Sequence, residues 1–118
     1  MDSKGLSMNL VKSPLRYPGG KSRAIKFLCQ YFPNDFKIYK EPFFGGGSVG
    51  IYIAQTMKNI KIYANDLNYE LYCFWNSLKM QPDKFIDGIV ELKNKFKNGK
   101  ELYNFILYRR DSNLSSLE

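Results

Sequence analysis

Three short stretches of the chain carry residues that suit the binding of a small molecule. The first is "EPFFGGGSVG", residues 41–50, which has three successive glycines after a hydrophobic run. Glycines let a loop turn tightly and let a ligand touch the backbone, and the helix expected after them adds partial positive charge at its N-terminus. The stretch has neither the G-x-G-x-x-G order nor G-K-[ST]. A phosphate-gripping loop is therefore the weaker interpretation, and a plain flexible turn is an alternative.

The second stretch is "NDLN", in which Asp66 stands about twenty residues beyond the glycines. In doubly wound folds, an acid at the end of the second strand accepts hydrogen bonds from the ribose hydroxyls of a cofactor. The alternative is an aspartate that starts a turn, which is common. The order strand, glycine loop, helix, strand, acid favours a cofactor site.

The third stretch is "RYPGGK", residues 16–21, where two glycines precede Lys21. Open backbone beside a cation can hold a carboxylate or a phosphate, with Tyr17 as a flat apolar wall. Taken alone, this pattern is a weak indicator of a site.

Hydrophobic periodicity and turn residues predict the elements that must position these stretches. Helices are expected over about 22–32, 49–58, 69–80, 85–96 and 102–106, with strands within 36–42 and 59–64. Ser22 and Ser48 are predicted to cap the first two helices. Residues 109–118 lose the periodicity, and no element is predicted there.

Strands that alternate with helices indicate a parallel α/β sheet with right-handed crossovers. Only two strands are evident, whereas parallel sheets normally have more strands and are covered on both faces. The sequence therefore predicts about the first third of a doubly wound domain.

Composition limits the classes of function. The 118 residues are enough for one small domain, and the net charge of +7 suits a polyanion such as nucleic acid. A solvated, lysine-rich surface is the alternative. The chain has no histidine, which excludes histidine general bases, Ser-His-Asp triads and histidine-ligated metals within it.

The two cysteines, Cys29 and Cys73, are far apart and lie among apolar residues, so they are predicted to be buried free thiols in a reducing cytoplasm. The first residues have no apolar run long enough for a signal peptide, and no stretch approaches the length of a membrane span. A soluble, cytoplasmic protein without a membrane or metal partner is therefore expected.

Taken in order, the three stretches resemble the N-terminal part of the D12-class, or Dam-like, adenine-N6 DNA methyltransferases. In that family an aromatic residue before G-G-K, the lysine itself, an E-P-F-x-G-x-G loop and an acid after the second strand bind S-adenosylmethionine. The resemblance is good over residues 13–80 and looser beyond them. It implies cofactor contacts at Tyr17, Gly19, Gly20, Lys21, Glu41, Pro42, Phe43, Gly45, Gly47 and Asp66. Within this set, Lys21 is expected at the amino-acid end of the cofactor and Asp66 at its ribose.

The resemblance also implies an α/β fold of a particular kind, a partial Rossmann-like S-adenosylmethionine-dependent methyltransferase fold. Residues 1–12 are expected to form an N-terminal arm, residues 13–82 the N-terminal part of the cofactor-binding domain, and residues 83–118 a truncated helical start of the target-recognition region.

Basic and aromatic side chains of that last segment can approach DNA phosphates, and a solvated face with aromatics in the core is the alternative. These residues are Lys93, Lys95, Lys97, Lys100, Tyr103, Tyr108, Arg109 and Arg110.

One motif of the family is missing from the sequence. The catalytic D-P-P-Y, or a close variant, accepts hydrogen bonds from the N6 of the flipped adenine, and these 118 residues contain no Pro-Pro. No catalytic residue is therefore assigned.

The expected function is methyl transfer from S-adenosylmethionine to adenine N6 in double-stranded DNA. The chain is expected to be an N-terminal portion, inactive alone, of a truncated enzyme or of a split enzyme whose separate C-terminal half carries the motif. The alternative is a non-catalytic, basic nucleic-acid-binding or accessory protein on a degenerate methyltransferase fold.

Overall fold

The computed structural model describes residues 9–115, with side chains as far as residue 112. The chain divides into two compact units between Tyr72 and Cys73. Within the described residues the fold is mixed α/β, with a two-stranded parallel sheet and five α-helices. This confirms the α/β class and the parallel pairing predicted from the sequence.

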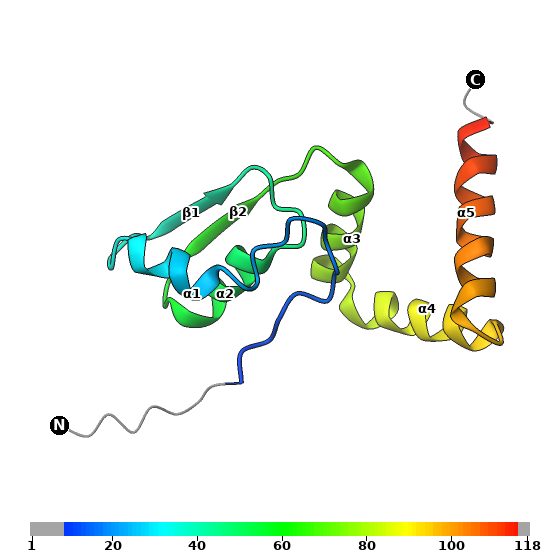
Figure 1. Cartoon of the computed structure of the whole chain (residues 1–118), viewed down its shortest axis with the longest axis horizontal. Helices are drawn as coiled ribbons and strands as arrows, with labels where there is room; N and C mark the ends of the chain where they lie inside the picture. The colour runs from blue at the N-terminus through cyan, green and yellow to red at the C-terminus, as the bar shows by residue number, and fades with distance from the viewer. Residues whose placement is uncertain (1–8, 116–118) are drawn as a thin grey trace. The chain divides into compact units, whose positions relative to one another are not determined.

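The first unit is built around strands β1 (Ile38–Glu41) and β2 (Lys61–Ala64), which pair in parallel with Tyr39 opposite Ile62. Helix α2 (Ser48–Thr56) connects the strands, and α1 (Ile25–Leu28) contacts α2. Both helices lie on the same side of the two strands (Figure 1).

The core of this unit lies under α2, where Val49 and Ile53 are buried and Ile53 is only 1% exposed. Along β1 the side chains alternate, because successive residues of a strand point to opposite faces. Tyr39 and Glu41 are half-buried, whereas Ile38 and Lys40 are exposed.

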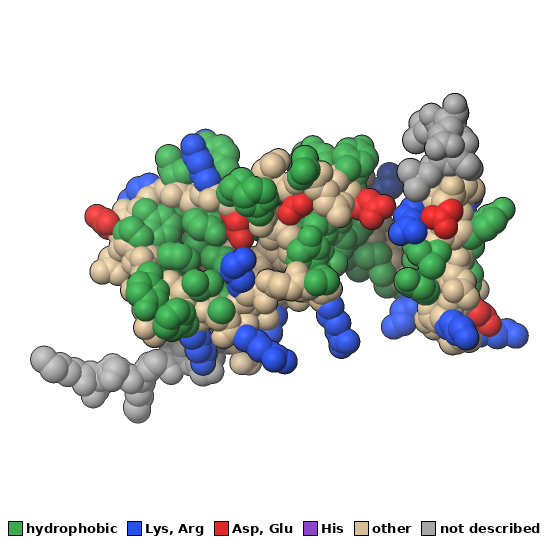
Figure 2. Space-filling model, turned by 45° about the horizontal axis from the view of Figure 1, so that its top comes forward, with side chains coloured by type: hydrophobic (Ala, Val, Ile, Leu, Met, Phe, Trp, Pro, Cys, Tyr) green, Lys and Arg blue, Asp and Glu red, His purple; other side chains and the backbone are tan. Residues whose placement is uncertain are grey.

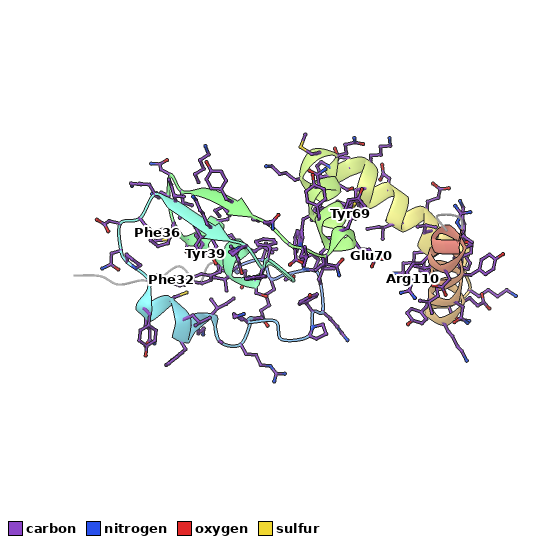
Figure 3. The ribbon with its side chains drawn as sticks, turned by 90° about the horizontal axis from the view of Figure 1, so that it is seen from above. Phe32, Phe36, Tyr39, Tyr69, Glu70 and Arg110 are labelled. Carbon is purple, nitrogen blue, oxygen red and sulfur yellow. The ribbon has the colours of Figure 1, made fainter. Side chains whose placement is uncertain are left out.

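Two aromatic side chains contact each other in the segment just before β1. The rings of Phe32 and Phe36 meet edge to face with their centroids 6.3 Å apart (Figure 3). Such a geometry brings the positive edge of one ring to the negative face of the other.

Two predicted helix starts in this unit were wrong. Ser22 does not cap a helix that runs to residue 32, because α1 covers only Ile25–Leu28 and continues as a 3₁₀ turn over Cys29–Tyr31. Ser48 is the first residue of α2, and the residue before it, Gly47, takes the N-cap position. Gly47 has a φ of +68°, which a glycine adopts without strain.

Helix α3 (Tyr69–Met80) crosses from the first unit into the second. Its start is fixed by Asn68, whose Oδ1 accepts the backbone N–H groups of Glu70 (3.0 Å) and Leu71 (3.3 Å). Asparagine is a preferred residue at this position, because its side chain satisfies N–H groups that have no partner inside the helix.

The second unit adds α4 (Pro82–Lys95) and α5 (Gly99–Ser115). Phe74 of α3 packs edge to face on Phe85 of α4 at 5.4 Å between ring centroids. Helix α5 continues into residues 109–118, where no element was predicted, as far as Ser115, so that prediction was wrong. No glycine or proline between residues 100 and 115 interrupts it.

Many hydrophobic side chains of the second unit stay exposed, among them Ile86, Val90 and Tyr108. Hydrophobic side chains are visible on the surface in Figure 2. None of the helices within residues 9–115 has the length and apolar character that crossing a membrane requires. Both cysteines are free, as predicted, but they are partly exposed and not buried.

Candidate functional site

The glycine loop after β1 is packed against the ring of Tyr17. A Cβ at Gly45 would lie 2.9 Å from Cε1 of Tyr17, and one at Gly46 would lie 3.0 Å from its Cβ. Gly45 also has a φ of +51°, which side chains rarely tolerate. The glycines therefore clear space for a side chain of the same protein, and Tyr17 itself stays 41% exposed.

The "RYPGGK" stretch forms a tight turn that carries Lys21. The Gly20 N–H donates to the Tyr17 carbonyl at 3.0 Å, and Gly19 has a φ of +73°. Proline followed by a glycine of positive φ is the pattern of a type II turn. The turn places Lys21 close enough to Glu41 for its charge to lower the pKa of that carboxyl.

Asp66 connects the end of β2 to the glycine loop. Its Oδ2 accepts the Gly45 N–H at 2.7 Å, and its Oδ1 accepts the Asn68 N–H at 2.9 Å. The second bond is the turn-starting interaction that the sequence offered as an alternative. The first is a contact across 21 positions of the chain, so Asp66 also holds the loop in place.

Glu41 ends β1 with a carboxylate oxygen, Oε2, that is buried without a hydrogen-bond partner among the described residues. Burial raises the pKa of Glu41 above its ordinary value of 4.5, because water solvates the charge less. The nearby Tyr39 hydroxyl and Gly50 N–H and the charge of Lys21 act in the opposite direction and lower that pKa. An unpaired buried oxygen is costly, so Oε2 is suited to receive a donor or a cation.

Gly50 of α2 allows this carboxylate and the Phe44 ring to approach the helix. A Cβ at Gly50 would lie 2.5 Å from Cε2 of Phe44 and 3.3 Å from Oε2 of Glu41. The same burial, together with the Glu41 charge, raises the pKa of Tyr39 well above its usual range.

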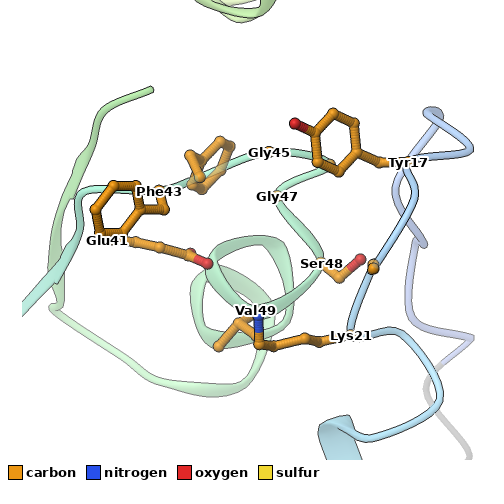
Figure 4. A pocket seen from close by; sticks show the side chains of 12 residues that line it. Tyr17, Lys21, Glu41, Phe43, Gly45, Gly47, Ser48 and Val49 are labelled. Carbon is orange, nitrogen blue, oxygen red and sulfur yellow. The ribbon is translucent and has the colours of Figure 1, made fainter. Parts of the chain in front are cut away.

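These elements enclose a pocket of about 60 Å³ at the start of α2. Its lining residues are Tyr17, Gly19, Gly20, Lys21, Glu41, Phe43, Phe44, Gly45, Gly46, Gly47, Ser48 and Val49. Figure 4 shows the Glu41 carboxylate and the Lys21 ammonium pointing toward the same space beside that helix start. Pockets for whole ligands are roughly 300–1,000 Å³, so the described residues form one subsite and not a complete site.

The pocket brings together eight of the ten predicted site residues, and the other two lie elsewhere. Pro42 and Asp66 do not line it. Asp66 reaches the glycine loop through Gly45, and Phe43 lies at the rim with 84% of its surface exposed.

Sequence reasoning missed two residues that fasten this site, Ser13 and Gln55. The Ser13 hydroxyl donates to the Gly46 carbonyl, and the Gln55 side chain bonds the backbone of Val11. Neither residue belongs to a motif, and contacts across 33 and 44 positions leave no periodic trace in the sequence.

Acidic and cysteine side chains do not gather into a metal site in the part of the chain that the structure describes, where no three of them lie close enough to hold an ion.

Comparison with known proteins identifies relatives of this chain. The family model of the D12 class N6 adenine-specific DNA methyltransferase matches residues 17–117. The type II methyltransferase M.MjaIII of Methanocaldococcus jannaschii is 30% identical over 91 residues, which cover 73% of this chain and 32% of that protein.

Two further relatives are bacterial. The modification methylase StsI of Streptococcus sanguinis is 32% identical over 82 residues, covering 69% of this chain and 12% of its own length. The type II methyltransferase M1.LlaDCHI of Lactococcus lactis subsp. cremoris is 27% identical over 88 residues, covering 75% of this chain and 29% of its own length. The matched part of this chain thus spans about a third or less of each relative.

Proposed function

Since the chain belongs to the D12 class of N6 adenine-specific DNA methyltransferases, we propose that its first unit binds S-adenosylmethionine and serves methyl transfer to adenine N6 in double-stranded DNA. The presence of Lys21 and of an unpartnered Glu41 oxygen in the lining of one small pocket carries the proposal. When bound, S-adenosylmethionine supplies the methyl group.

The charges of the pocket suit the amino-acid end of this cofactor. That end is a zwitterion, with one ammonium and one carboxylate. The Glu41 carboxylate suits the ammonium and the Lys21 ammonium suits the carboxylate, since charge-assisted hydrogen bonds are the strong ones. The N-terminus of α2, which has no side-chain cap, adds N–H groups that also favour the carboxylate.

The neighbouring residues suit the adenosine part. Asp66 is proposed to accept hydrogen bonds from the ribose hydroxyls, since each carboxylate oxygen has acceptor capacity beyond the single N–H that it receives. The exposed Phe43 ring at the pocket rim offers an apolar face to the adenine. The loop that follows Glu41 at the end of β1 contains Pro42, Gly45 and Gly47, and it is proposed to connect the subsite for the amino-acid end with that for the adenosine part.

A larger architecture follows from family membership and remains part of the proposal. The two strands and α2 are proposed as the beginning of a Rossmann-like sheet, within a cofactor-binding segment 13–82. Segment 83–118 is proposed to begin the target-recognition region, with basic side chains of α4 and α5 near DNA phosphates. Two of those basic residues form ion pairs, Lys95 with Glu91 at 2.8 Å and Arg110 with Asp111 at 3.1 Å.

The first test of the proposal is the substitution Lys21→Ala. It should weaken binding of S-adenosylhomocysteine by about tenfold to a hundredfold, because one charge-assisted hydrogen bond is lost. Binding of adenosine, which lacks the amino-acid end, should change less than about threefold. Isothermal titration calorimetry of both ligands measures the difference.

The matched control is Lys26→Ala, which removes an exposed lysine of α1 that does not line the pocket. It should leave both affinities unchanged. Equal losses for both ligands in the Lys21 variant would show that this lysine supports folding and does not contact the amino-acid end.

Glu41→Gln is expected to abolish a pH dependence of binding. Burial raises the pKa of Glu41 in the free protein, whereas an ammonium beside Oε2 favours its ionised form. Wild-type affinity for S-adenosylhomocysteine should therefore rise with pH until Glu41 is ionised in the free protein, which its raised pKa places at a higher pH than for an exposed glutamate. The Gln variant should bind more weakly and without this rise. The control ligand is 5′-methylthioadenosine, which has no ammonium, so its affinity should not show this rise with pH.

Without ligand, the free energy of unfolding should change with pH in the opposite direction to the affinity. A carboxyl whose pKa is raised by folding holds its proton longer in the native state, so the free energy of unfolding falls as pH rises above 4.5. Urea unfolding at a series of pH values measures this fall, which should be smaller in Glu41→Gln than in the wild type. If the affinity and the free energy of unfolding of the variant both depend on pH as they do in the wild type, the role given to Glu41 is contradicted.

A further inference from the structure

We propose that Gln55 and Ser13 are positioning residues that hold Tyr17 and Lys21 in the pocket, an inference that rests on the function proposed above. Neither side chain lines the pocket itself. Both fasten the segment just before the "RYPGGK" turn to the part of the fold that carries the glycine loop.

Gln55, near the end of α2, forms hydrogen bonds to the backbone of Val11 through both the oxygen and the nitrogen of its side-chain amide. The Val11 N–H donates to Oε1 of Gln55 at 2.8 Å, and Nε2 of Gln55 donates to the Val11 carbonyl at 2.9 Å. Nε2 also donates to the Ile51 carbonyl at 3.0 Å, which orients the side chain along its own helix. The amide thus uses one acceptor and both donor hydrogens and pairs with Val11 as a neighbouring strand would.

Ser13 makes the second attachment two residues later. Its hydroxyl donates to the Gly46 carbonyl and accepts the Leu15 N–H at 3.2 Å. One oxygen atom therefore joins the incoming segment to the middle of the glycine loop and also shapes the bend that follows. The Ser13 side chain is half-buried, so water competes less for these bonds than at an exposed position.

These attachments lie upstream of the two groups that face the pocket. Tyr17 follows Ser13 by four positions and packs on Gly45 and Gly46, and its carbonyl accepts the Gly20 N–H that closes the turn before Lys21. The positions of the Tyr17 ring and the Lys21 ammonium therefore depend on how residues 11–13 are held against α2 and the glycine loop. Release of the segment at Val11 or at Gly46 should therefore loosen recognition of the amino-acid end and leave the rest of the pocket intact.

The experiment compares two ligands on the 118-residue protein by isothermal titration calorimetry. S-adenosylhomocysteine carries the amino-acid end, and 5′-methylthioadenosine lacks it. In Gln55→Ala and Ser13→Ala, affinity for the first should fall about fivefold to tenfold, and affinity for the second should change less than about twofold. Ser13→Thr keeps the hydroxyl and should restore the wild-type ratio of the two affinities.

Thr56→Ala is the matched control on the same helix. The Thr56 hydroxyl donates to the Tyr52 carbonyl at 2.8 Å and takes no part in the attachments at Val11 and Gly46. The variant loses a side-chain hydrogen bond of α2 and should keep the wild-type ratio. Equal losses for both ligands in the Gln55 and Ser13 variants would overturn the proposal, because a general loss of stability lowers both affinities alike.

Hydrogen exchange at the Gly20 N–H provides a readout without ligand. It should speed up about tenfold in Gln55→Ala and Ser13→Ala and stay unchanged in Thr56→Ala. Unchanged exchange in the first two variants would overturn the inference. Failure of the wild-type protein to bind either ligand would overturn the proposed function instead, and the exchange rates would still decide whether these residues fasten the turn.

Discussion

Asp66→Ala is expected to weaken binding of S-adenosylhomocysteine by about a hundredfold or more. The substitution removes the acceptor proposed for the ribose hydroxyls and also the acceptors of the Gly45 and Asn68 N–H groups. A hydrogen bond to a charged group contributes about 1.5–3 kcal/mol, so the loss of even one corresponds to about tenfold or more in affinity. Calorimetric titration of the variant measures the loss.

The two roles of Asp66 can be separated with ligands that differ only at the ribose. Wild-type protein should bind adenosine more tightly than 2′,3′-dideoxyadenosine, and in the Asp66 variant the two affinities should become equal. This comparison is a double-mutant cycle between side chain and ligand. A preference for adenosine that survives in the variant would mean that Asp66 only holds the glycine loop.

Asn68→Ala is the control for damage to the same turn. It removes the cap of α3, which accepts the N–H groups of Glu70 and Leu71, and leaves the Asp66 bond to Gly45 in place. Loss of such a cap costs about 1 kcal/mol of stability. The cofactor affinity of this variant should stay close to that of the wild type.

Local patterns predicted the elements of the first unit better than the contacts within its site. Hydrophobic periodicity and turn residues placed both strands, and their order with a helix between them predicted parallel pairing, which the register of Tyr39 with Ile62 confirms. The exact helix starts were harder to predict. A serine that precedes a helix is a common N-cap, so Ser48 was predicted at that position. In the structure the N-cap is Gly47, a glycine that adopts the αL conformation without strain.

The glycine loop shows that a glycine motif predicts a close approach to the backbone but not which group makes that approach. A run of glycines indicates that something approaches the backbone, and the sequence favoured a ligand. In the structure the space that a Cβ at Gly45 would need is taken by the ring of Tyr17, which comes from another of the three stretches. Asp66 likewise combines the turn-starting role and a bond to the loop, so the two interpretations offered by the sequence were not exclusive.

Contacts between distant residues account for most of what the sequence could not predict. Ser13 and Gln55 act through hydrogen bonds from their side chains to backbone groups, and almost any backbone position can accept or donate such a bond. The buried oxygen of Glu41 and the ring of Phe44 both lie close to Gly50, an arrangement that follows from packing and not from sequence spacing.

The 118-residue protein is expected to transfer no methyl group to DNA by itself, even with S-adenosylmethionine bound. The lone pair of adenine N6 is delocalised into the ring, so the nitrogen is a poor nucleophile until hydrogen-bond acceptors direct it at the methyl group. The acid–Pro–Pro–aromatic motif that would provide these acceptors is absent from the sequence. By analogy with an oxyanion-hole donor, each lost interaction of this kind should cost about 10²–10³ in rate. Binding of S-adenosylmethionine in the proposed pocket brings the methyl group near the adenine but does not direct the lone pair of N6.

Addition of a D12-class polypeptide that carries the motif should restore transfer if it pairs with this chain. The unpaired edges of β1 and β2 among the described residues offer backbone N–H and C=O groups for such pairing. Incorporation of a radiolabelled methyl group into adenine-containing duplex DNA measures the reaction. In the restored mixture, Asp66→Ala in this chain should lower transfer because the cofactor binds more weakly. Transfer by the 118 residues alone, after mass spectrometry excludes a contaminating methyltransferase, would place the catalytic groups within the chain and contradict the division of roles proposed for it.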